Sequence, residues 1–462
     1  MYEDSQQRMT AEQLRNSILQ EAISGRLVPQ DPNDEPASAL LARIREEKAR
    51  LVKEGKLKKK DLAETPIAED EIPFEIPSSW VWVNLEYVTY QVGNKTNQIQ
   101  SKDIKKEGIY RVVSQGQKLY DGYSNNKECV INDLPLVMFG DHTRNVKYVD
   151  FPFVIGADGT KFFKAISIEA RFLYYWMVYT AKTLRNRGYA RHYTLLRVVP
   201  FPLPPLAEQK RIVAKLEELL PIVEQYGKAQ KELDELNAAL PSRLRQSILQ
   251  EAISGKLVPQ DENDEPVDIL FNHIQEEKLK LIKQNIIRKK EAVINAVKED
   301  EIPFDIPSSW KWCHLEELVA ILDGYRKPVS KHDREVGTYP YYGANGVLDY
   351  VRDYIFDGEY LLVGEDGSVI TSYGNPIVNK ASGKIWVNNH AHVLQECGTL
   401  GYYDYLFYAL QAISIKKYIH GFMPKYSQGD LRKTMIPLPP LAEQQRIVAK
   451  IEELFAEIDK LK

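Results

Sequence analysis

The stretch LRNSILQEAISGRLVPQ, which runs from Leu14 to Gln30, returns as LRQSILQEAISGKLVPQ from Leu244 to Gln260, with two changes in seventeen positions. Two segments that stay this similar within one chain are expected to face the same surroundings. An internal repeat of this kind indicates a duplicated architecture. The residues between the two copies are therefore expected to be inserted domains.

Two further pairs follow the same plan. EDEIPFEIPSSWVW from Glu69 returns as EDEIPFDIPSSWKW from Glu299, and PLPPLAEQKRIVAKLEEL from Pro202 returns from Pro437 with sixteen of eighteen positions identical. Each half therefore contains a helix end, a charged linker, a Pro-Trp entry, a variable block, a Pro-rich exit and a helix start. The variable blocks share only sparse matches, which is what two like platforms with different ligands require.

Apolar residues after each Pro-rich exit recur at alternating steps of four and three, which is typical of a coiled-coil seam. The pattern continues along the middle of the chain, where Pro221 and Pro241 are expected to kink or interrupt the helix. The alternative is that both stripes are core helices of unrelated bundles. The predicted seam residues are Ile212, Leu216, Leu219, Val223, Leu233, Leu236, Leu240, Ile447, Ile451, Leu454, Ile458 and Leu461.

The lengths of these helical stretches match. Residues 206–244 number 39, and residues 441–462 joined to residues 1–14 number 36. The two chain ends are therefore predicted to rebuild a second long helix, antiparallel to the central one, in a circular pseudo-twofold arrangement. A continuous helix over residues 206–244 would span at most roughly 58 Å at 1.5 Å per residue.

The variable blocks predict an α+β fold. They contain all of the 27 tyrosines except Tyr2 and Tyr226. Short apolar runs separated by Gly, Asn and Pro predict strands, and residues 171–188 and 402–421 predict one helix near the end of each block. The predicted segments are an N-terminal helical part of the distal spacer (1–30), a charged linker (31–72), a first variable domain (73–203), a central helical spacer (204–260), a second charged linker (261–302), a second variable domain (303–438) and a C-terminal helix that pairs with the central spacer (439–462).

Composition excludes several classes of protein. Cys129, Cys313 and Cys397 lie far apart, so neither a zinc cluster nor a disulfide framework is predicted. No signal-peptide core and no run of eighteen apolar residues occurs, so we expect a cytoplasmic protein without a membrane partner. The chain also lacks a GxxxxGK[ST] phosphate loop. A metal role for His390 and His392 is a minor alternative to core or polar contacts, and we predict no metal site.

The repeated PLPPLAEQxRIVAKxEEL and LRxSILQEAISGxLVPQ, placed around two divergent blocks, resemble the specificity (S) subunit of type I restriction-modification systems over essentially all 462 residues. The resemblance implies two target-recognition domains that each read one half of a bipartite DNA site, with the helices as a spacer. It also implies docking of two modification subunits and association with restriction (translocase) subunits.

The same resemblance implies that the chain is not an enzyme and binds no cofactor itself. S-adenosylmethionine, ATP and Mg²⁺ would belong to its partner subunits. Two alternatives remain at this stage: the specificity subunit of a type IIB restriction-modification enzyme, and a coiled-coil interaction protein without a DNA role.

Recognition of double-stranded DNA requires hydrogen-bond donors and acceptors directed into a groove, and cations for the phosphates. The first block carries 17 Lys and Arg against 10 Asp and Glu, and the second 12 against 14, so phosphate contacts are expected mainly in the first. The candidate DNA-binding residues are Asp141, His142, Thr143, Arg144, Asn145, Lys147, Arg185, Arg187, Tyr189, Arg191, His192 and Tyr193 in the first block, and Tyr341, Tyr342, Asn345, Glu365, Asp366, Ser368, Tyr373, Lys425 and Tyr426 in the second.

Overall fold

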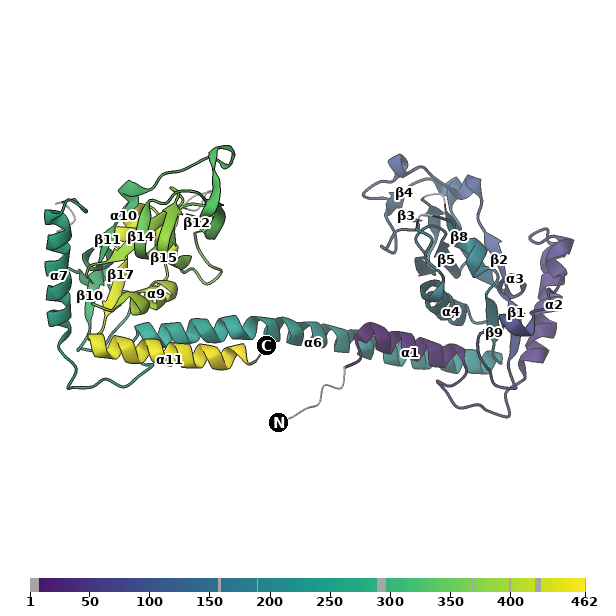
Figure 1. The fold of residues 1–462 in the computed structure, drawn as a ribbon. Helices are drawn as coiled ribbons and strands as arrows, with labels where there is room; N and C mark the ends of the chain where they lie inside the picture. The colour runs from purple at the N-terminus through teal and green to yellow at the C-terminus, as the bar shows by residue number, and fades with distance from the viewer. Residues whose placement is uncertain are drawn as a thin grey trace. The chain divides into compact units, whose positions relative to one another are not determined.

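The computed structural model describes residues 8–156, 159–188, 190–288, 296–367, 369–398, 400–419 and 425–461. The chain divides into two compact units, Met1–Leu233 and Asp234–Lys462, and each is described by itself (Figure 1). Within the described ranges, no helix combines the length and the apolar composition needed to cross a bilayer.

In unit 1, helix α1 (Ala11–Ile23) packs against the first part of helix α6 (Leu206–Ile253) (Figure 1). Thr10 caps α1 in a capping box with Gln13. The Tyr226 hydroxyl donates to the Met9 carbonyl at 2.9 Å, and Gln30 Nε2 donates to Glu208 at 2.5 Å. Because the contacts of α6 run in reverse order along the N-terminal segment, the pairing is antiparallel, as predicted.

Unit 2 repeats this pairing with helix α11 (Leu441–Asp459) and the second part of α6. Arg245 forms an ion pair with Asp459 at 2.8 Å, and Gln260 Nε2 donates to Glu443 at 2.8 Å. The helix α6 continues through Pro221 and Pro241, so they do not interrupt it, while the predicted kink stays a prediction. Each proline removes one backbone donor, and the helix continues on both sides of that loss. The prediction that α11 and α1 together rebuild one helix concerns both units and stays a prediction.

Domain 1 of unit 1, residues 81–203, is an α+β domain with two small sheets. One sheet has the order β2-β8-β5-β6, and the other has the order β4-β3-β7 with β3 and β7 parallel. The strands are β2 (Thr89–Val92), β3 (Tyr110–Val113), β4 (Gly122–Ser124), β5 (Leu136–Gly140), β6 (Val146–Val149), β7 (Phe153–Ile155) and β8 (Thr160–Ala165), and the helices are α3 (Leu85–Val88), α4 (Ala170–Thr183) and α5 (Tyr193–Leu196).

Domain 2 of unit 2, residues 311–438, is an α+β domain built on one six-stranded sheet. The strand order is β11-β16-β14-β15-β12-β13, and the only parallel pair among the described strands of this sheet is β12 with β15. The strands are β11 (Val319–Ile321), β12 (Val336–Gly343), β13 (Gly346–Val351), β14 (Phe356–Gly364), β15 (Val378–Val387) and β16 (Ala391–Glu396), and the helices are α8 (Leu315–Leu318), α9 (Tyr403–Ala412) and α10 (Gln428–Arg432).

Each of the two predicted charged linkers contains packed structure. Each contains a helix of 17 residues, α2 (Ala37–Lys53) and α7 (Val267–Lys283), whose apolar face joins the core of its unit. Two lysines are buried within them. The Lys48 ammonium lies 4.3 Å from the centre of the Tyr87 ring, and the Lys278 ammonium donates to the Glu316 carbonyl.

The predicted seam residues are buried only near the two ends of α6. Ile212, Leu216, Val223, Ile447, Ile451 and Ile458 are buried, and Leu219 and Leu454 are half-buried. The structure does not bury the other members: Leu233, Leu236 and Leu240 in the middle of α6 are 41%, 53% and 43% exposed, and Leu461 after α11 is 62% exposed. The apolar period persists in the sequence beyond the region in which a partner helix covers it.

Each domain is attached to its helices by a two-stranded antiparallel ribbon. In unit 1 the ribbon is β1 (Val81–Asn84) with β9 (Pro200–Leu203), and in unit 2 it is β10 (Lys311–His314) with β17 (Met435–Leu438). The registers match, because the first residue of one strand pairs with the last residue of the other in both ribbons. The Pro-Trp entry and the Pro-rich exit of the sequence therefore meet at one junction.

A buried carboxylate joins the repeated motifs at each junction. In unit 1, Glu208 accepts hydrogen bonds from Trp80 Nε1 at 2.8 Å and from Gln30. In unit 2, Glu443 accepts from Trp310 Nε1 at 2.9 Å and from Gln260 at 2.8 Å. The glutamines end the two copies of LVPQ, so the opening motif is duplicated for an internal reason: it completes this junction.

The glycine of the SG step in that motif is required by space and by backbone conformation. Gly25 has φ +73°, and a Cβ placed there would lie 2.5 Å from Pro77 Cγ. Gly255 has φ +72°, and a Cβ there would lie 2.3 Å from Pro307 Cγ. Only glycine accepts this left-handed backbone with a proline ring packed against it.

Candidate nucleic-acid interface

Three loops of domain 1 meet at Gln115, which follows β3. Its carbonyl accepts from Thr143 Oγ1 at 2.7 Å and from Asn145 Nδ2 at 2.8 Å, and its Oε1 accepts from the His142 backbone at 3.2 Å. A Cβ on Gly159 would lie 2.7 Å from the His142 ring, so the start of β8 closes against the same point. The candidate residues 141–145 therefore lie on a loop that Gln115 supports.

The Arg-rich segment after α4 joins this loop cluster. Asp141 Oδ1 accepts from the Tyr193 backbone at 2.7 Å, and the Asp141 carbonyl accepts from the His192 backbone at 2.8 Å. Arg144 has φ +59° and donates to the Leu184 carbonyl at 2.9 Å. The structure thus brings together the two segments that the sequence proposed for DNA contact in the first domain.

Several of these candidates are in the interior and do not face a ligand. Asp141, Lys147 and His192 are buried, so their prediction as DNA-binding residues is wrong. Lys147 lies on β6 where the strand alternation turns it inward, and its ammonium donates to the Ser114 carbonyl at 2.5 Å. Burial lowers its pKa, and Asp121 acts in the opposite direction.

The remaining candidates of domain 1 reach the surface to different degrees. Thr143, Arg185, Arg187 and Arg191 are exposed, and His142, Arg144, Asn145 and Tyr193 are half-buried. The Tyr193 hydroxyl donates to Glu86 at 3.0 Å and accepts from Gln91 at 2.8 Å, and burial followed by Glu86 raises its pKa to about 12. Tyr189 lies outside the described residues.

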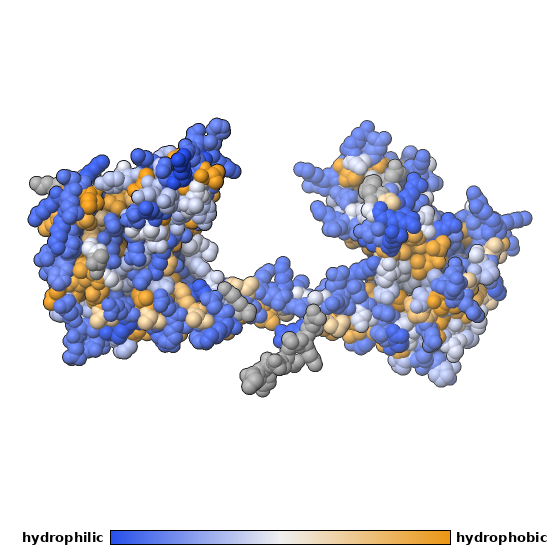
Figure 2. Space-filling model, in the orientation of Figure 1, coloured by the Kyte–Doolittle hydropathy of each residue, from blue (hydrophilic) through white to orange (hydrophobic). Residues whose placement is uncertain are grey.

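The sequence reading missed a set of exposed lysines beside the Gln115 loop. Lys106 and Lys118 line a surface hollow around β4 with Tyr120 and Tyr123. Figure 2 shows mainly hydrophilic atoms over the end of domain 1 that carries β3 and β4. The sequence did contain a sign of this set, because lysines are the majority of the basic residues in this block. These lysines, however, belong to no motif. Lys102, Lys105 and Lys127 are also exposed.

In domain 2, four segments meet around the buried His392 of β16. Asp323 follows β11, Glu365 follows β14, and Tyr426 precedes α10. His392 Nδ1 lies 2.6 Å from Asp323 Oδ2, and its Nε2 lies 2.8 Å from the Tyr426 carbonyl. Arg326 lies 2.6 Å from Glu365 Oε2 and 3.3 Å from Asp323 Oδ2.

Two candidates of domain 2 are core residues. Tyr341 is buried, with its hydroxyl donating to the Val329 carbonyl at 3.2 Å and accepting from the Val329 backbone at 3.0 Å. Tyr426 is buried with its hydroxyl against Thr434. Their prediction as DNA-binding residues is wrong, because both rings fill the core. Asn345, Tyr373 and Lys425 are exposed, Tyr342, Glu365 and Asp366 are half-buried, and Ser368 lies outside the described residues.

The loops on this side of domain 2 also lie close together. Asp366 forms an isolated bridge with Lys425, and its carboxylate lies 2.5 Å from His390 Nδ1. The strand end before the turn that contains Asn345 is held by Asn388, whose backbone N–H donates to the Tyr342 carbonyl at 3.1 Å. Glu365, Asp366 and Lys425 therefore form one edge, supported from below by the residues around His392. Tyr373 does not join it, because it lines a hollow with Arg243 and Gln250 of α6.

Asp323, Glu365 and His392 bring three metal-ligating atoms within 4.8 Å of one another. The guanidinium of Arg326 bonds to both carboxylates of this set, and His392 Nδ1 already contacts Asp323. A cation is therefore in place among these donors, and the set does not fit a metal ion. His390 points to Asp366 and does not join His392 in a second donor pair.

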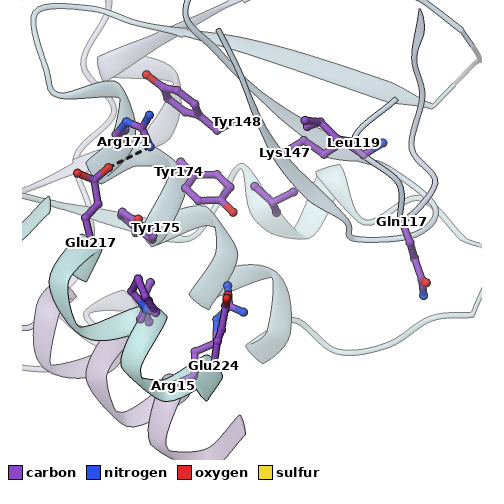
Figure 3. A pocket seen from close by; sticks show the side chains of 13 residues that line it. Arg15, Gln117, Leu119, Lys147, Tyr148, Arg171, Tyr174, Tyr175, Glu217 and Glu224 are labelled. Carbon is purple, nitrogen blue, oxygen red and sulfur yellow. Dashed lines mark ion pairs between the residues drawn. The ribbon is translucent and has the colours of Figure 1, made fainter. Parts of the chain in front are cut away.

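A cavity lies between domain 1 and the helices of unit 1 (Figure 3). It has a volume of about 470 Å³ and is lined by Tyr148, Tyr174 and Tyr175 on one side. Arg171 forms an ion pair with Glu217 at 3.0 Å and lies 4.5 Å from the centre of the Tyr148 ring. Since this arginine is already paired with a carboxylate, it is a poor phosphate ligand.

Comparison with known proteins gives matches over both halves of the chain. A family model described as the type I restriction modification DNA specificity domain matches residues 77–235 and, again, residues 307–462. Each match begins near the Pro-Trp entry and includes one domain with the helix that follows it. The family model therefore has the same unit of repetition as the structure.

The specificity subunit of the type I restriction enzyme EcoAI from Escherichia coli is 29% identical over 534 residues, with 97% of this chain and 90% of that protein covered. The EcoEI specificity subunit, also from Escherichia coli, is 28% identical over 553 residues with the same coverage. Among solved structures, the HsdS subunit from Thermoanaerobacter tengcongensis is 20% identical with a TM-score of 0.41, covering 84% of this chain and 92% of that one.

Proposed function

The chain belongs to the type I restriction-modification DNA specificity family, and on that premise we propose that it reads a bipartite DNA target, one half with each domain. The observation that carries the proposal is the pair of matched junctions. Trp80 with Glu208 and Trp310 with Glu443 mount two dissimilar domains in the same way. Two equivalent junctions that carry domains with different polar loop edges fit a protein that recognises two different half-sites.

In domain 1 the exposed arginines after α4 and the lysines around β4 would bind phosphates, while His142, Thr143 and Asn145 would approach base edges. In domain 2 the corresponding edge is acidic and amide-rich, with Asn345, Glu365 and Asp366 beside Lys425. Carboxylates accept from the cytosine amine and amides bind adenine, so direct base contacts would dominate there.

We further propose that the chain works as a non-catalytic subunit. Two modification subunits that carry S-adenosylmethionine would dock on the helical regions and methylate adenine, and restriction subunits would supply the chemistry that uses ATP and Mg²⁺. The helix α6, whose residues belong to both units, would set the length of the unspecified spacer between the half-sites.

The test is a single-molecule map of methylated adenines in DNA from cells that express this chain with its modification partner. A split motif, two short specified halves around a fixed gap, is the expected result. Methylated adenines that share no split motif would contradict the proposal.

Two variants sharpen the test. Replacing residues 81–203 with a second copy of residues 311–438, joined at the matching strand ends, should remove the half-site of domain 1 and leave that of domain 2. Inserting about four residues, one helical turn, near Lys231 should change the gap and leave both half-sites unchanged. An unchanged gap would show that α6 does not set the distance.

A further inference from the structure

The buried group around His392 has a complete hydrogen-bond arrangement. Asp323 Oδ2 accepts from Gln428 Nε2 at 2.7 Å, and Asp323 Oδ1 accepts from the Val393 backbone at 2.9 Å. Arg326 reaches the same carboxylate and also donates to the Ala391 carbonyl at 2.8 Å. Burial raises the pKa of Asp323, but the hydrogen bond from His392 and the charges of His392 and Arg326 outweigh it and hold that pKa below its usual range.

This arrangement determines the role of the imidazole. The Tyr426 carbonyl can only accept, so His392 Nε2 donates to it. Asp323 is a carboxylate surrounded by donors, so His392 Nδ1 donates as well. Both ring nitrogens therefore face acceptors, and the imidazole lies with Arg326 between the carboxylates of Asp323 and Glu365.

The group ties the loop edge of domain 2 to its sheet. Glu365 begins the loop after β14, and its carbonyl accepts from the Tyr426 backbone at 2.8 Å. Its carboxylate meets Arg326 at 2.6 Å and Lys425 at 3.4 Å. His392 holds the Tyr426 carbonyl from the other side. The segments that carry Glu365, Asp366 and Lys425 are therefore fixed to each other through buried charges.

We propose that His392 and Arg326 are positioning residues for DNA recognition by domain 2: they hold the loop edge in the geometry that discriminates its half-site and do not touch DNA. The inference rests on the proposed function and deepens it for one domain. His392 is fully buried, and the Arg326 side chain is 12% exposed, so neither side chain is available for base contact.

At the matching loops of domain 1, the described residues form a different arrangement. Its buried His192 donates from Nδ1 to the Asp141 carbonyl at 3.0 Å and accepts at Nε2 from the Arg187 backbone at 3.1 Å. One nitrogen faces an acceptor and the other a donor, so this imidazole has a different hydrogen-bond arrangement from that of His392. Among the residues that the structure describes, the group of His392 and Arg326 is thus particular to domain 2, and domain 1 serves as an internal control in the same molecule.

The experiment measures the methylation map of the assembled complex for the wild-type chain and for His392→Asn. The variant should lower discrimination between the cognate domain 2 half-site and single mismatches by about tenfold, the scale of one well-placed base contact. Discrimination at the domain 1 half-site should not change. His314→Asn, which removes a buried histidine of β10 in the same unit, controls for a loss of stability and should leave both half-sites unchanged.

A second pair of variants keeps the test decisive if His392→Asn fails to fold. Arg326→Leu should relax the domain 2 half-site, and Arg326→Lys, which retains the charge, should restore most of the discrimination. Histidine ¹⁵N spectra of the full chain, with His392 assigned from its variant among eight histidines, should show two protonated ring nitrogens.

Three results would overturn the inference. One is an unchanged domain 2 half-site in folded His392→Asn or Arg326→Leu, and another is a singly protonated His392. The third is one equivalent of divalent metal in the purified chain whose removal by EDTA relaxes the half-site, because it would make the group a metal site. A wild-type map without a split motif would instead contradict the proposed function.

Discussion

The junctions and the domains of this molecule differ in how far their two copies have diverged. Asp34 pairs with Arg211 at 2.7 Å in unit 1, and Asp264 pairs with Arg446 at 2.7 Å in unit 2, next to the matching tryptophan and glutamate contacts. The mounted domains differ even in sheet topology, with four- and three-stranded sheets in one and a six-stranded sheet in the other. A junction made of buried, directional contacts allows few substitutions, whereas the surface that it carries is free to change.

The comparison also changes the explanation of the duplicated motif. A docking surface for two copies of a partner is one reason for two copies of SILQEAISG. The structure supplies another, because Leu19, Ala22 and Ile23 are buried in the core of unit 1, and Leu249, Ala252 and Ile253 in that of unit 2. Internal packing alone accounts for the identity of these positions.

The largest expected effect is the loss of a junction tryptophan. Trp80→Ala and Trp310→Ala each remove a buried ring and leave a glutamate without its indole donor, so each should cost about 3–5 kcal/mol of unfolding free energy. Urea unfolding gives the magnitude, and hydrogen exchange in α4 and α9 shows which unit is affected. If the junctions are equivalent, the two costs agree within about 1 kcal/mol. A cost confined to one variant would show that they are not.

Replacing the buried carboxylate of the unit 1 junction should have a smaller effect on the unfolding free energy. Glu208→Gln places an amide among donors and should cost about 1–3 kcal/mol at neutral pH. Burial raises the pKa of Glu208, while Trp80 and Gln30 act in the opposite direction. The folded state therefore holds the proton more tightly than the unfolded state, and this contribution to stability is full below the unfolded pKa and is lost as pH rises through the folded one.

The excess unfolding free energy of the wild-type chain over Glu208→Gln should therefore decrease as pH increases from about 4 to 7. Unfolding free energies of both proteins, measured in urea across that range, test the sign. An advantage that grows with pH would show that the hydrogen bonds to the carboxylate dominate its burial.

The ion pair at each junction should contribute less than the carboxylate. The Asp34 and Asp264 side chains are 9% and 8% exposed, and both arginines are 36% exposed, so solvent screens each pair from one side. Each bidentate pair should give a coupling energy of about 1 kcal/mol in a double-mutant cycle with alanine. Equal coupling in the two cycles is the expected result. A pair with no measurable coupling would have to be regarded as a surface contact.

Several features were accessible from the sequence because they repeat or have a period. The two domains, their late helices and the antiparallel pairing of α6 with the chain ends were predicted correctly. The helices α2 and α7 were missed although Ala37, Leu40, Ile44 and Leu51 have a helical period, because the lysines and glutamates between them were taken as a linker. A periodic pattern predicts a helix or a strand. It does not show which residues of a loop face outward.

The loop edges show that limit at single residues. His192 and Lys147 have side chains suited to DNA contact. Only the fold shows that these side chains are hydrogen-bonded to the backbone carbonyls of Asp141 and Ser114. Arg326 and Gln115 stand in no motif, yet they organise the two edges. Contacts between residues 28 to 51 positions apart decide these roles, and no local pattern contains them.

The smallest expected effect concerns the exposed middle of α6. Leu216 is fully buried against the junction, so Leu216→Ala should cost about 2–5 kcal/mol. Leu236 belongs to the same apolar period but is 53% exposed, so Leu236→Ala should change the unfolding free energy of the chain by less than about 0.5 kcal/mol. Urea unfolding of the two variants measures both. A large cost at Leu236 would show that a helix covers this stretch in the isolated chain, which would restore the continuous seam that the sequence predicts.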